Sequence, residues 1–409
     1  RLMAPRELLT VADYRSAAQR AVPDMVWAYI EGGCEDEATL RRNREAFLSW
    51  RLRQRVLAAP GEPELGTEVA GVPLSLPIVL APTGLSGIVH WQGELAAAQA
   101  AERAGTRAVI SNAATYSLEE IAEGTRESHW FQLYPWGNNR RHIGEMLRRA
   151  QASGYHALFV TVDVPTYGLR ETELRRGMGL PPLLTPRRAA TALARPRWAY
   201  GFVRHRRYSL RNLVDQAGVR AAARSLQLHR EYLYPDMSWA DLDWVRARWP
   251  GPTYVKGIMD PSDAERAVAL GLDGIVVSNH GGRQLESGVG ALDALPAVVA
   301  AVGGRAQVLF DGGIRRGSDI VKALALGASC VLVGRPFLYG LAVRGREGVT
   351  SVLEILRSEL RRTLILMGCR SVGELDPSWL VPPEGLPLAE PGWEAPGRRD
   401  ASRAGAHSL

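Results

Sequence analysis

Short apolar runs alternate with longer amphipathic segments along most of the chain after residue 75. The runs are rich in β-branched residues and almost continuously apolar, which is typical of strands buried on both faces of a parallel sheet. Eight such runs occur, at 77–81, 108–111, 130–134, 157–163, 253–257, 274–278, 307–311 and 330–334. The segments between them are predicted helices, at 93–105, 117–123, 143–154, 240–249, 261–271, 292–302 and 318–327. Eight strand–helix units predict an α/β fold, the TIM (β/α)8 barrel.

A doubly wound sheet is the competing α/β architecture. It would normally carry a glycine-rich phosphate-binding turn after its first strand. The sequence at that point is Ala81-Pro82-Thr83-Gly84, which lacks that fingerprint. The barrel is therefore favoured.

Three segments fall outside the repeating units. Residues 1–75 form an N-terminal segment with helical periodicity over 14–30 and 37–50. An insertion, about 166–238, separates the fourth unit from the fifth, and an insertion of this length is typical of a lid or a partner-binding loop. Residues 381–409 are rich in Pro, Gly and Arg and form a predicted tail. The barrel itself is expected over 76–380.

Composition narrows the class of protein. Of the 409 residues, 46% are hydrophobic and 23% charged, which excludes a mainly disordered chain. The formal net charge is +7, and residues 187–211 alone carry eight arginines and no acidic residue. The three cysteines are far apart and form neither a disulfide framework nor a zinc spacing, so we expect a cytoplasmic protein without a metal. No apolar run approaches the roughly 18 residues that span a bilayer.

Polar residues and glycines gather at the predicted strand ends, where a TIM barrel carries its active site. The third to eighth strands end in Gln132 and Tyr134, Thr161 and Asp163, Lys256, Ser278 to Arg283 (SNHGGR), Asp311 to Gly317 (DGGIRRG) and Gly334 to Pro336 (GRP). Glycine-rich turns with arginines after the last two strands occupy the usual phosphate position of this fold. A tight turn with solvated arginines is the alternative. We expect a phosphorylated ligand.

His280 is the candidate base. It lies at a strand end between glycines and three residues before Arg283, which suits a base beside a carboxylate-binding guanidinium. The alternative is a hydrogen-bonded core histidine. For Lys256 the alternative to a functional role is a salt bridge.

The segments SNHGGRQLE and DGGIRRGSDIVKALALGA make the sequence similar to the FMN-dependent α-hydroxy acid oxidase and dehydrogenase family, over about residues 10–380. Residues 82–85, 197–205 and 338–342 resemble the mandelate-oxidising branch of that family. The resemblance implies FMN-dependent oxidation of an (S)-2-hydroxy acid, with an aryl or other bulky group, to the 2-keto acid. It also implies a homo-oligomer, a tetramer in this family.

Site residues follow from the same resemblance. It implies that His280 is the catalytic base and that Asp163 stabilises its imidazolium form. Arg170 and Arg283 would bind the substrate carboxylate, because two guanidinium forks orient a planar anion. Tyr134 and Tyr29, the latter from the N-terminal segment, would hydrogen-bond the substrate. Gly84 and Ala113 stand where bulkier side chains occur in the family, so a widened substrate pocket is expected.

The resemblance also implies an FMN-binding set. Lys256 would lie near the N1–C2 edge of the flavin, where negative charge collects on reduction. The other expected contacts are Ser111, Gln132 and Thr161 to the ring edge, Pro82 and Thr83 by backbone, Ser278 and Asp311 to the ribityl chain, and Gly313, Arg315, Gly334 and Arg335 to the phosphate.

Several alternatives stay open from the sequence. The electron acceptor is dioxygen in an oxidase, or a membrane quinone or carrier in a dehydrogenase. The arginine-rich stretch 187–211 contains four aromatic residues and is either a peripheral contact with the inner face of the membrane or a solvated lid. A nucleic-acid-binding protein is the rival class. It could use this stretch but leaves the strand-end residues unexplained, so no nucleic acid partner is expected.

Overall fold

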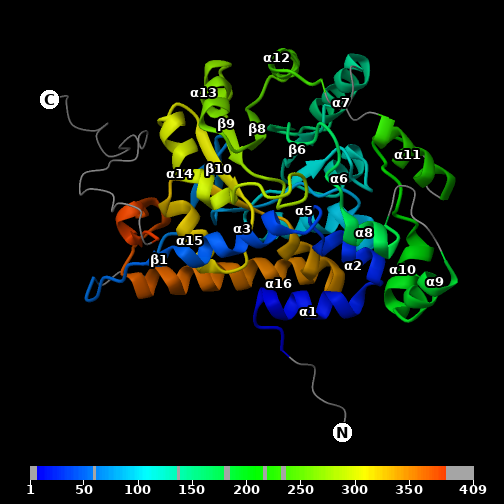
Figure 1. The fold of residues 1–409 in the computed structure, drawn as a ribbon, viewed down its shortest axis with the longest axis horizontal. Helices are drawn as coiled ribbons and strands as arrows, with labels where there is room; N and C mark the ends of the chain where they lie inside the picture. Colours follow the sequence, from blue (N-terminus) through cyan, green and yellow to red (C-terminus); the bar gives the residue numbers. More distant parts are fainter. Residues whose placement is uncertain are drawn as a thin grey trace, which may run out of the picture.

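The computed structural model describes residues 7–58, 61–135, 139–178, 185–214, 219–231 and 236–383. Most of the predicted tail, from residue 384 onward, lies outside the described residues. Within them, one eight-stranded parallel barrel forms the centre of the molecule, surrounded by helices (Figure 1).

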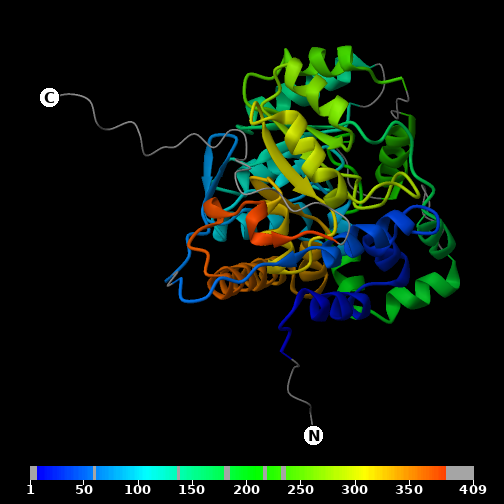
Figure 2. The same ribbon diagram turned by 60° about the vertical axis from the view of Figure 1, so that its left-hand side comes forward.

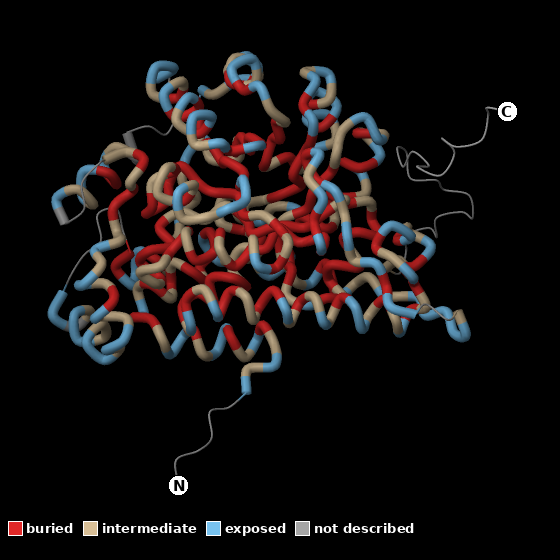
Figure 3. Tube along the Cα trace, turned by 180° about the vertical axis from the view of Figure 1, so that it is seen from behind, coloured by how far each residue is buried: buried red, intermediate tan, exposed pale blue. Residues whose placement is uncertain are grey.

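The eight predicted strands are all confirmed, and they pair in sequence order around the barrel. They are β4 (Ile78–Leu80), β5 (Val109–Ser111), β6 (Trp130–Leu133), β7 (Leu158–Thr161), β8 (Thr253–Ile258), β9 (Gly274–Val277), β10 (Gln307–Asp311) and β11 (Cys330–Val333). Strand β11 pairs with β4, and an isolated bridge between Leu80 and Ala108 brings β4 beside β5. Figure 3 shows the buried positions concentrated in these central strands.

The seven predicted crossover helices are also present. They are α5 (Gly93–Arg103), α6 (Leu118–Glu123), α7 (Arg140–Ala152), α12 (Trp239–Arg246), α13 (Pro261–Ala269), α14 (Ala291–Val302) and α15 (Gly317–Ala325). After β11 comes α16 (Arg335–Met367), which is kinked at Arg344 and Gly345. A short helix, α4 (Ser86–Val89), precedes α5, and two 3-10 turns, Val372–Glu374 and Pro377–Trp379, follow α16.

The N-terminal segment differs from the prediction in two ways. The helical stretch expected over 14–30 is two helices, α1 (Val11–Ala21) and α2 (Asp24–Glu31), followed by α3 (Ala38–Ser49). Val22 ends α1 in extended conformation, because proline disfavours helix at the residue before it and Pro23 follows. Helix α1 packs along α16, while α2 and α3 approach the carboxyl end of the barrel.

The second difference is a β-hairpin, which lies after the two stretches of expected helical periodicity and was not predicted. Strands β2 (Thr67–Val69) and β3 (Val72–Leu74) pair antiparallel around a turn at Ala70 and Gly71, both with positive φ. Val69, Ala70 and Leu74 pack against the inward residues at the amino end of the barrel and close it. A further two-residue strand, β1 (Arg51–Leu52), pairs with β12 (Leu380–Val381).

The described residues of the insertion form four helices before α12: α8 (Glu171–Arg176), α9 (Pro186–Leu193), α10 (Pro196–His205) and α11 (Val219–Glu231). They lie on the outside of the barrel, beside the N-terminal helices (Figures 1 and 2). In the described part of the chain, no helix has both the length and the apolar character needed to cross a bilayer.

Candidate active site

His280 is the middle member of a row of three side chains at the carboxyl end of the barrel. Its Nδ1 lies 3.0 Å from Oδ1 of Asp163, and its Nε2 lies 3.3 Å from the Tyr134 hydroxyl. The residue follows β9 with a φ of 58°, a left-handed conformation that is uncommon outside glycine. Its backbone N–H donates to Ser278 Oγ at 3.1 Å, which holds the turn. The structure thus brings together three residues predicted from separate strands.

Gly257 makes the close approach of Asp163 possible. The pairing of β8 with β9 is irregular between Lys256 and Ile258, and Gly257 has a φ of 110°. A Cβ at this position would lie 2.6 Å from the Cβ of Asp163. Any side chain at residue 257 would therefore displace Asp163 from His280.

The electrostatics of this pair favour a neutral base. Burial lowers the pKa of His280 below its ordinary value, and the Asp163 carboxylate opposes this only in part. Burial alone would raise the pKa of Asp163, but His280 and Lys256 outweigh it, so that pKa is lowered. With Nδ1–H donating to the carboxylate, Nε2 of the imidazole carries the lone pair and can accept a proton.

The two predicted substrate-binding arginines line one cavity with His280, and an acidic residue that the sequence analysis missed lies between them. Arg283 donates to the carbonyl oxygens of Tyr29 (2.9 Å) and Gly32 (2.8 Å) and to Oε1 of Glu173 (2.7 Å). Nη1 of Arg170 lies 4.0 Å from the other oxygen of Glu173. The i, i+3 spacing of Arg170 and Glu173 was the only sequence signal for this carboxylate.

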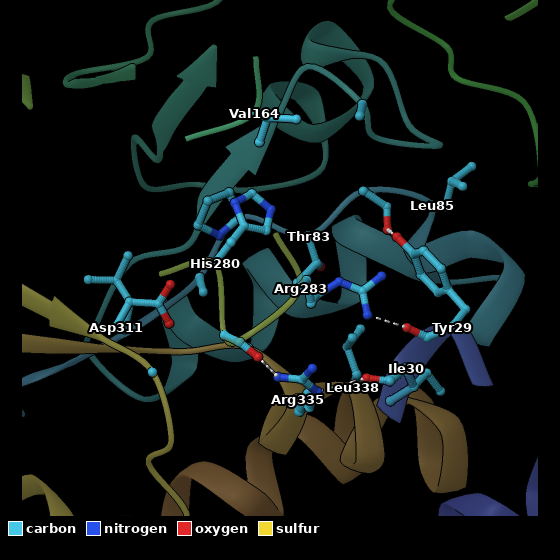
Figure 4. Close-up of a pocket in the computed structure, with 18 of the residues that line it drawn as sticks. Tyr29, Ile30, Thr83, Leu85, Val164, His280, Arg283, Asp311, Arg335 and Leu338 are labelled. Atoms are coloured by element: carbon cyan, nitrogen blue, oxygen red, sulfur yellow. Dashed lines mark hydrogen bonds between the residues drawn. The ribbon is translucent and has the colours of Figure 1, made fainter. Parts of the chain in front are cut away.

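Tyr29, Gly84 and Ala113 also meet at this cavity, whose lining side chains are shown in Figure 4. The Tyr29 hydroxyl donates to the carbonyl of Gly84 at 2.8 Å, and the Tyr29 ring lies beneath the guanidinium of Arg283. A Cβ at Gly84 would lie 3.1 Å from the Cβ of Ala113. The two small residues therefore bound the same part of the cavity wall.

Lys256 belongs to a buried network with Ser278 and Asp311. Its ammonium donates to Ser278 Oγ at 2.9 Å and lies 3.0 Å from Asp311 Oδ2, while the serine hydroxyl donates to the same carboxylate at 2.9 Å. Burial alone would lower the pKa of Lys256, but Asp311 and Asp163 outweigh it and raise that pKa. The salt bridge considered as the alternative for this lysine is present, and Lys256 also lines the cavity.

Buried polar atoms without partners lie beside this network. Among the described residues, both amide atoms of Gln132 and the hydroxyl of Thr161 are buried and lack a hydrogen-bond partner. Each residue lies at the carboxyl end of its strand, where Ser111 also lies and accepts from the backbone N–H of Ala113. Unpaired buried groups are costly, so these atoms mark a place for a ligand with donors and acceptors of its own.

The predicted phosphate-binding residues line the same cavity: Gly313, Arg315, Gly334 and Arg335. Arg335 also has a structural role that the sequence did not show. Its three guanidinium nitrogens donate to the carbonyls of Ile30 (3.1 Å), Gly281 (3.0 Å) and Gly32 (2.9 Å). Burial lowers its pKa to about 10, so it stays charged at neutral pH. Arg335 therefore ties α2 to the turn that follows His280.

The insertion contributes Met178, Leu210 and Leu226 to the cavity wall, residues that the sequence analysis did not single out. Helices α9 and α10 contribute none of the described lining residues. They dock beside the cavity instead: the indole N–H of Trp198 donates to the carbonyl of Ile88 at 2.7 Å, and His205 stacks on Trp91 with ring centroids 3.9 Å apart.

Comparisons with known proteins agree with this geometry. Residues 18–382 match the FMN-dependent dehydrogenase family. L-lactate dehydrogenase of Vibrio cholerae is 41% identical over 90% of this chain and 98% of the relative. (S)-mandelate dehydrogenase of Pseudomonas putida is 40% identical over 92% of this chain and 94% of the relative. A crystal structure described as monotopic membrane protein (S)-mandelate dehydrogenase superposes with a TM-score of 0.88 at 39% identity, covering 92% of this chain and all of that one.

Fold and site therefore define an oxidoreductase of the (β/α)8 barrel class. The chain belongs to the FMN-dependent dehydrogenase family, whose cofactor is FMN. The two relatives named above are dehydrogenases of 2-hydroxy acids. The residues present fit that cofactor. The unpartnered amide of Gln132 and hydroxyl of Thr161 suit the polar edge of a flavin, and Arg315 and Arg335 supply positive charge for a phosphate.

Proposed function

We propose that the protein oxidises an (S)-2-hydroxy monocarboxylic acid with an aryl or similarly bulky group to the 2-keto acid. The observation that carries the proposal is the imidazole of His280, held by Asp163 at 3.0 Å and facing a cavity that Arg170 and Arg283 also line. A base, an anion-binding pair and a flavin site in one cavity match this reaction.

The polar side chains around the cavity have separate roles in the proposed reaction. Arg170 and Arg283 bind the substrate carboxylate, and the hydroxyls of Tyr29 and Tyr134 orient its oxygens. Nε2 of His280 takes a proton from the substrate, the hydroxyl proton in a hydride route or the α-proton in a carbanion route. In both routes the adjacent carboxylate stabilises the resulting imidazolium.

FMN supplies the two-electron oxidation and would be held by the residues named for it in the sequence. Gln132 and Thr161 have unpartnered polar atoms for the ring edge, and Pro82 and Thr83 line the cavity. The ammonium of Lys256, kept charged by Asp311, would stabilise negative charge on the flavin.

Substrate size is proposed from the cavity rather than from the relatives. Lactate and mandelate dehydrogenases are equally similar in sequence, at 41% and 40% identity. Gly84 and Ala113 leave room on one wall, and Leu210, Leu226 and Met178 add an apolar surface from the insertion. An aryl group gains from burial against such a surface, whereas a methyl group gains little. A lactate-type substrate is the second candidate.

The electron acceptor is proposed to be a membrane carrier, with α9 and α10 as the membrane contact. Leu193, Tyr200 and Val203 expose 69–75% of their surface on these helices, among arginines. The inner face of α10 is docked through Trp198, so the exposed face is free to lie on an anionic bilayer. Because α9 and α10 do not line the cavity, a lid role falls to Leu210 and Leu226 instead.

Anaerobic addition of (S)-mandelate to the holoenzyme, with the visible flavin absorbance recorded, tests this function. We expect rapid bleaching, and rapid recovery when anionic vesicles containing a quinone are added, but slow recovery in air. Rapid recovery in air identifies an oxidase and removes the membrane acceptor. Bleaching by (S)-lactate but not by (S)-mandelate overturns the aryl substrate, and bleaching by neither overturns the proposed reaction.

A further inference from the structure

Glu173 is a buried carboxylate in the cavity wall with no role in the reaction described above. It lies on α8, the first helix of the insertion, and is only 5% exposed. Its two oxygens face the two substrate-binding guanidinium groups, at 2.7 Å from Arg283 and 4.0 Å from Arg170. A buried carboxylate in this position changes both the geometry and the charge of the anion site.

The charged side chains that line the cavity fall into three groups: a buried ion pair, the predicted phosphate site and the substrate end. Asp311 is paired with Lys256 at 3.0 Å. Arg315 and Arg335 belong to the predicted phosphate site, where a dianionic group would balance them. Of the described lining residues that remain, Arg170 and Arg283 are positive and Glu173 is negative. At the substrate end of the cavity, Glu173 therefore offsets one of the two guanidinium charges that face the substrate anion, and the carboxylate of Asp163 lies behind His280 at 3.0 Å.

The two guanidinium groups repel each other, and the carboxylate of Glu173 reduces this repulsion. Burial lowers the pKa of Arg170, Arg283 lowers it further, and Glu173 opposes the effect. Three of the five N–H groups of Arg283 donate to Glu173 and to two backbone carbonyls. Its Nε has no partner among the described residues. Its remaining donors thus point in a fixed direction for a ligand carboxylate.

We propose that Glu173 determines specificity by offsetting one guanidinium charge, so that the site prefers monocarboxylates to dicarboxylates. This inference rests on the proposed function, because it assumes that Arg170 and Arg283 bind the substrate anion. A dicarboxylate would bring a second negative charge close to the carboxylates of Glu173 and Asp163. Removing the negative charge of Glu173 leaves the charges of Arg170 and Arg283 without this offset and reduces the repulsion of the second carboxylate.

Oxamate and oxalate are suitable probes because they have nearly the same shape but carry one and two negative charges at neutral pH. Binding of each to the oxidised holoenzyme is titrated through the flavin spectrum, for the wild type, Glu173→Gln, Glu173→Asp and Glu171→Gln. The glutamine keeps an oxygen that accepts from Arg283 but has no charge. Glu171 is the matched control, because it lies on the same helix, is absent from the cavity wall and pairs with Arg175.

For Glu173→Gln we expect the ratio of the oxalate Kd to the oxamate Kd to fall about tenfold, while Glu171→Gln and Glu173→Asp keep the wild-type ratio. The ratio cancels any general loosening of the site. Equal weakening of both ligands in Glu173→Gln would show a purely positioning role and overturn the charge proposal, as would an unchanged ratio. Failure of the proposed function looks different: neither probe would then perturb the wild-type flavin.

Discussion

The two ends of the barrel are built from the same eight strands but are filled in opposite ways. At the amino end, Val69 and Leu74 of the β-hairpin pack against a stack of Trp130, Phe159 and Tyr254, with neighbouring ring centroids 5.5 and 4.8 Å apart. At the carboxyl end, the same strands end in charged and polar side chains around one cavity. One end is closed by apolar packing, and the other is held by hydrogen bonds and ion pairs.

This difference separates stability from chemistry along single strands. Strand β6 carries Trp130 at its amino end and Gln132, with unpartnered amide atoms, near its carboxyl end. Apolar burial contributes to the free energy of folding, whereas unpaired polar atoms reduce it and are retained where a ligand will pair with them. Substitutions at the two ends should therefore change different observables.

The largest effect is expected at the carboxyl end, for His280→Asn. Asparagine tolerates the positive φ of this residue but cannot act as the base. Loss of general-base catalysis should slow anaerobic flavin reduction by about 10²- to 10⁴-fold. FMN content and the unfolding midpoint should stay close to the wild-type values, and flavin reduction at the wild-type rate would remove His280 from the mechanism.

At the amino end, Leu74→Ala should lower stability without changing the chemistry. Leu74 is 3% exposed beneath the barrel, and truncation of a buried leucine costs about 2–5 kcal/mol in the free energy of unfolding. Denaturant unfolding gives this quantity, and kcat per mole of bound FMN should match the wild type. A large loss of kcat with unchanged stability would contradict the division between the two ends.

The smallest expected effect is a shift in pH dependence for Asp163→Asn. The carboxylate of Asp163 raises the pKa of His280 against the lowering effect of burial, so its removal lowers that pKa further. His280 must be unprotonated to act, so activity is lost as the pH falls through its pKa. The acidic limb of kcat/KM should therefore move to lower pH. A shift to higher pH would show that Asp163 does not stabilise the imidazolium.

Local patterns predicted most of the barrel because each strand–helix unit shows its own periodicity. The hairpin β2–β3 escaped prediction because each of its strands buries only one residue, so neither forms an apolar run, and both are stabilised by the barrel beneath them. The break between α1 and α2 was readable from Pro23 but was masked by apolar spacing that continues across it. The sequence could not decide whether 187–211 is a membrane contact or a lid, because only packing shows which part of the insertion reaches the cavity.

The sequence by itself determined the barrel, the family and the residues that converge at the strand ends, because these depend on local periodicity and on short motifs with fixed positions in the fold. Only the tertiary structure decided their partners. Glu173 meets Arg283 across 110 residues, and Arg335 meets Ile30 across 305. The sequence does not show whether a charged side chain will be buried or which group will neutralise it. Both depend on elements that are distant along the chain and become adjacent only after folding.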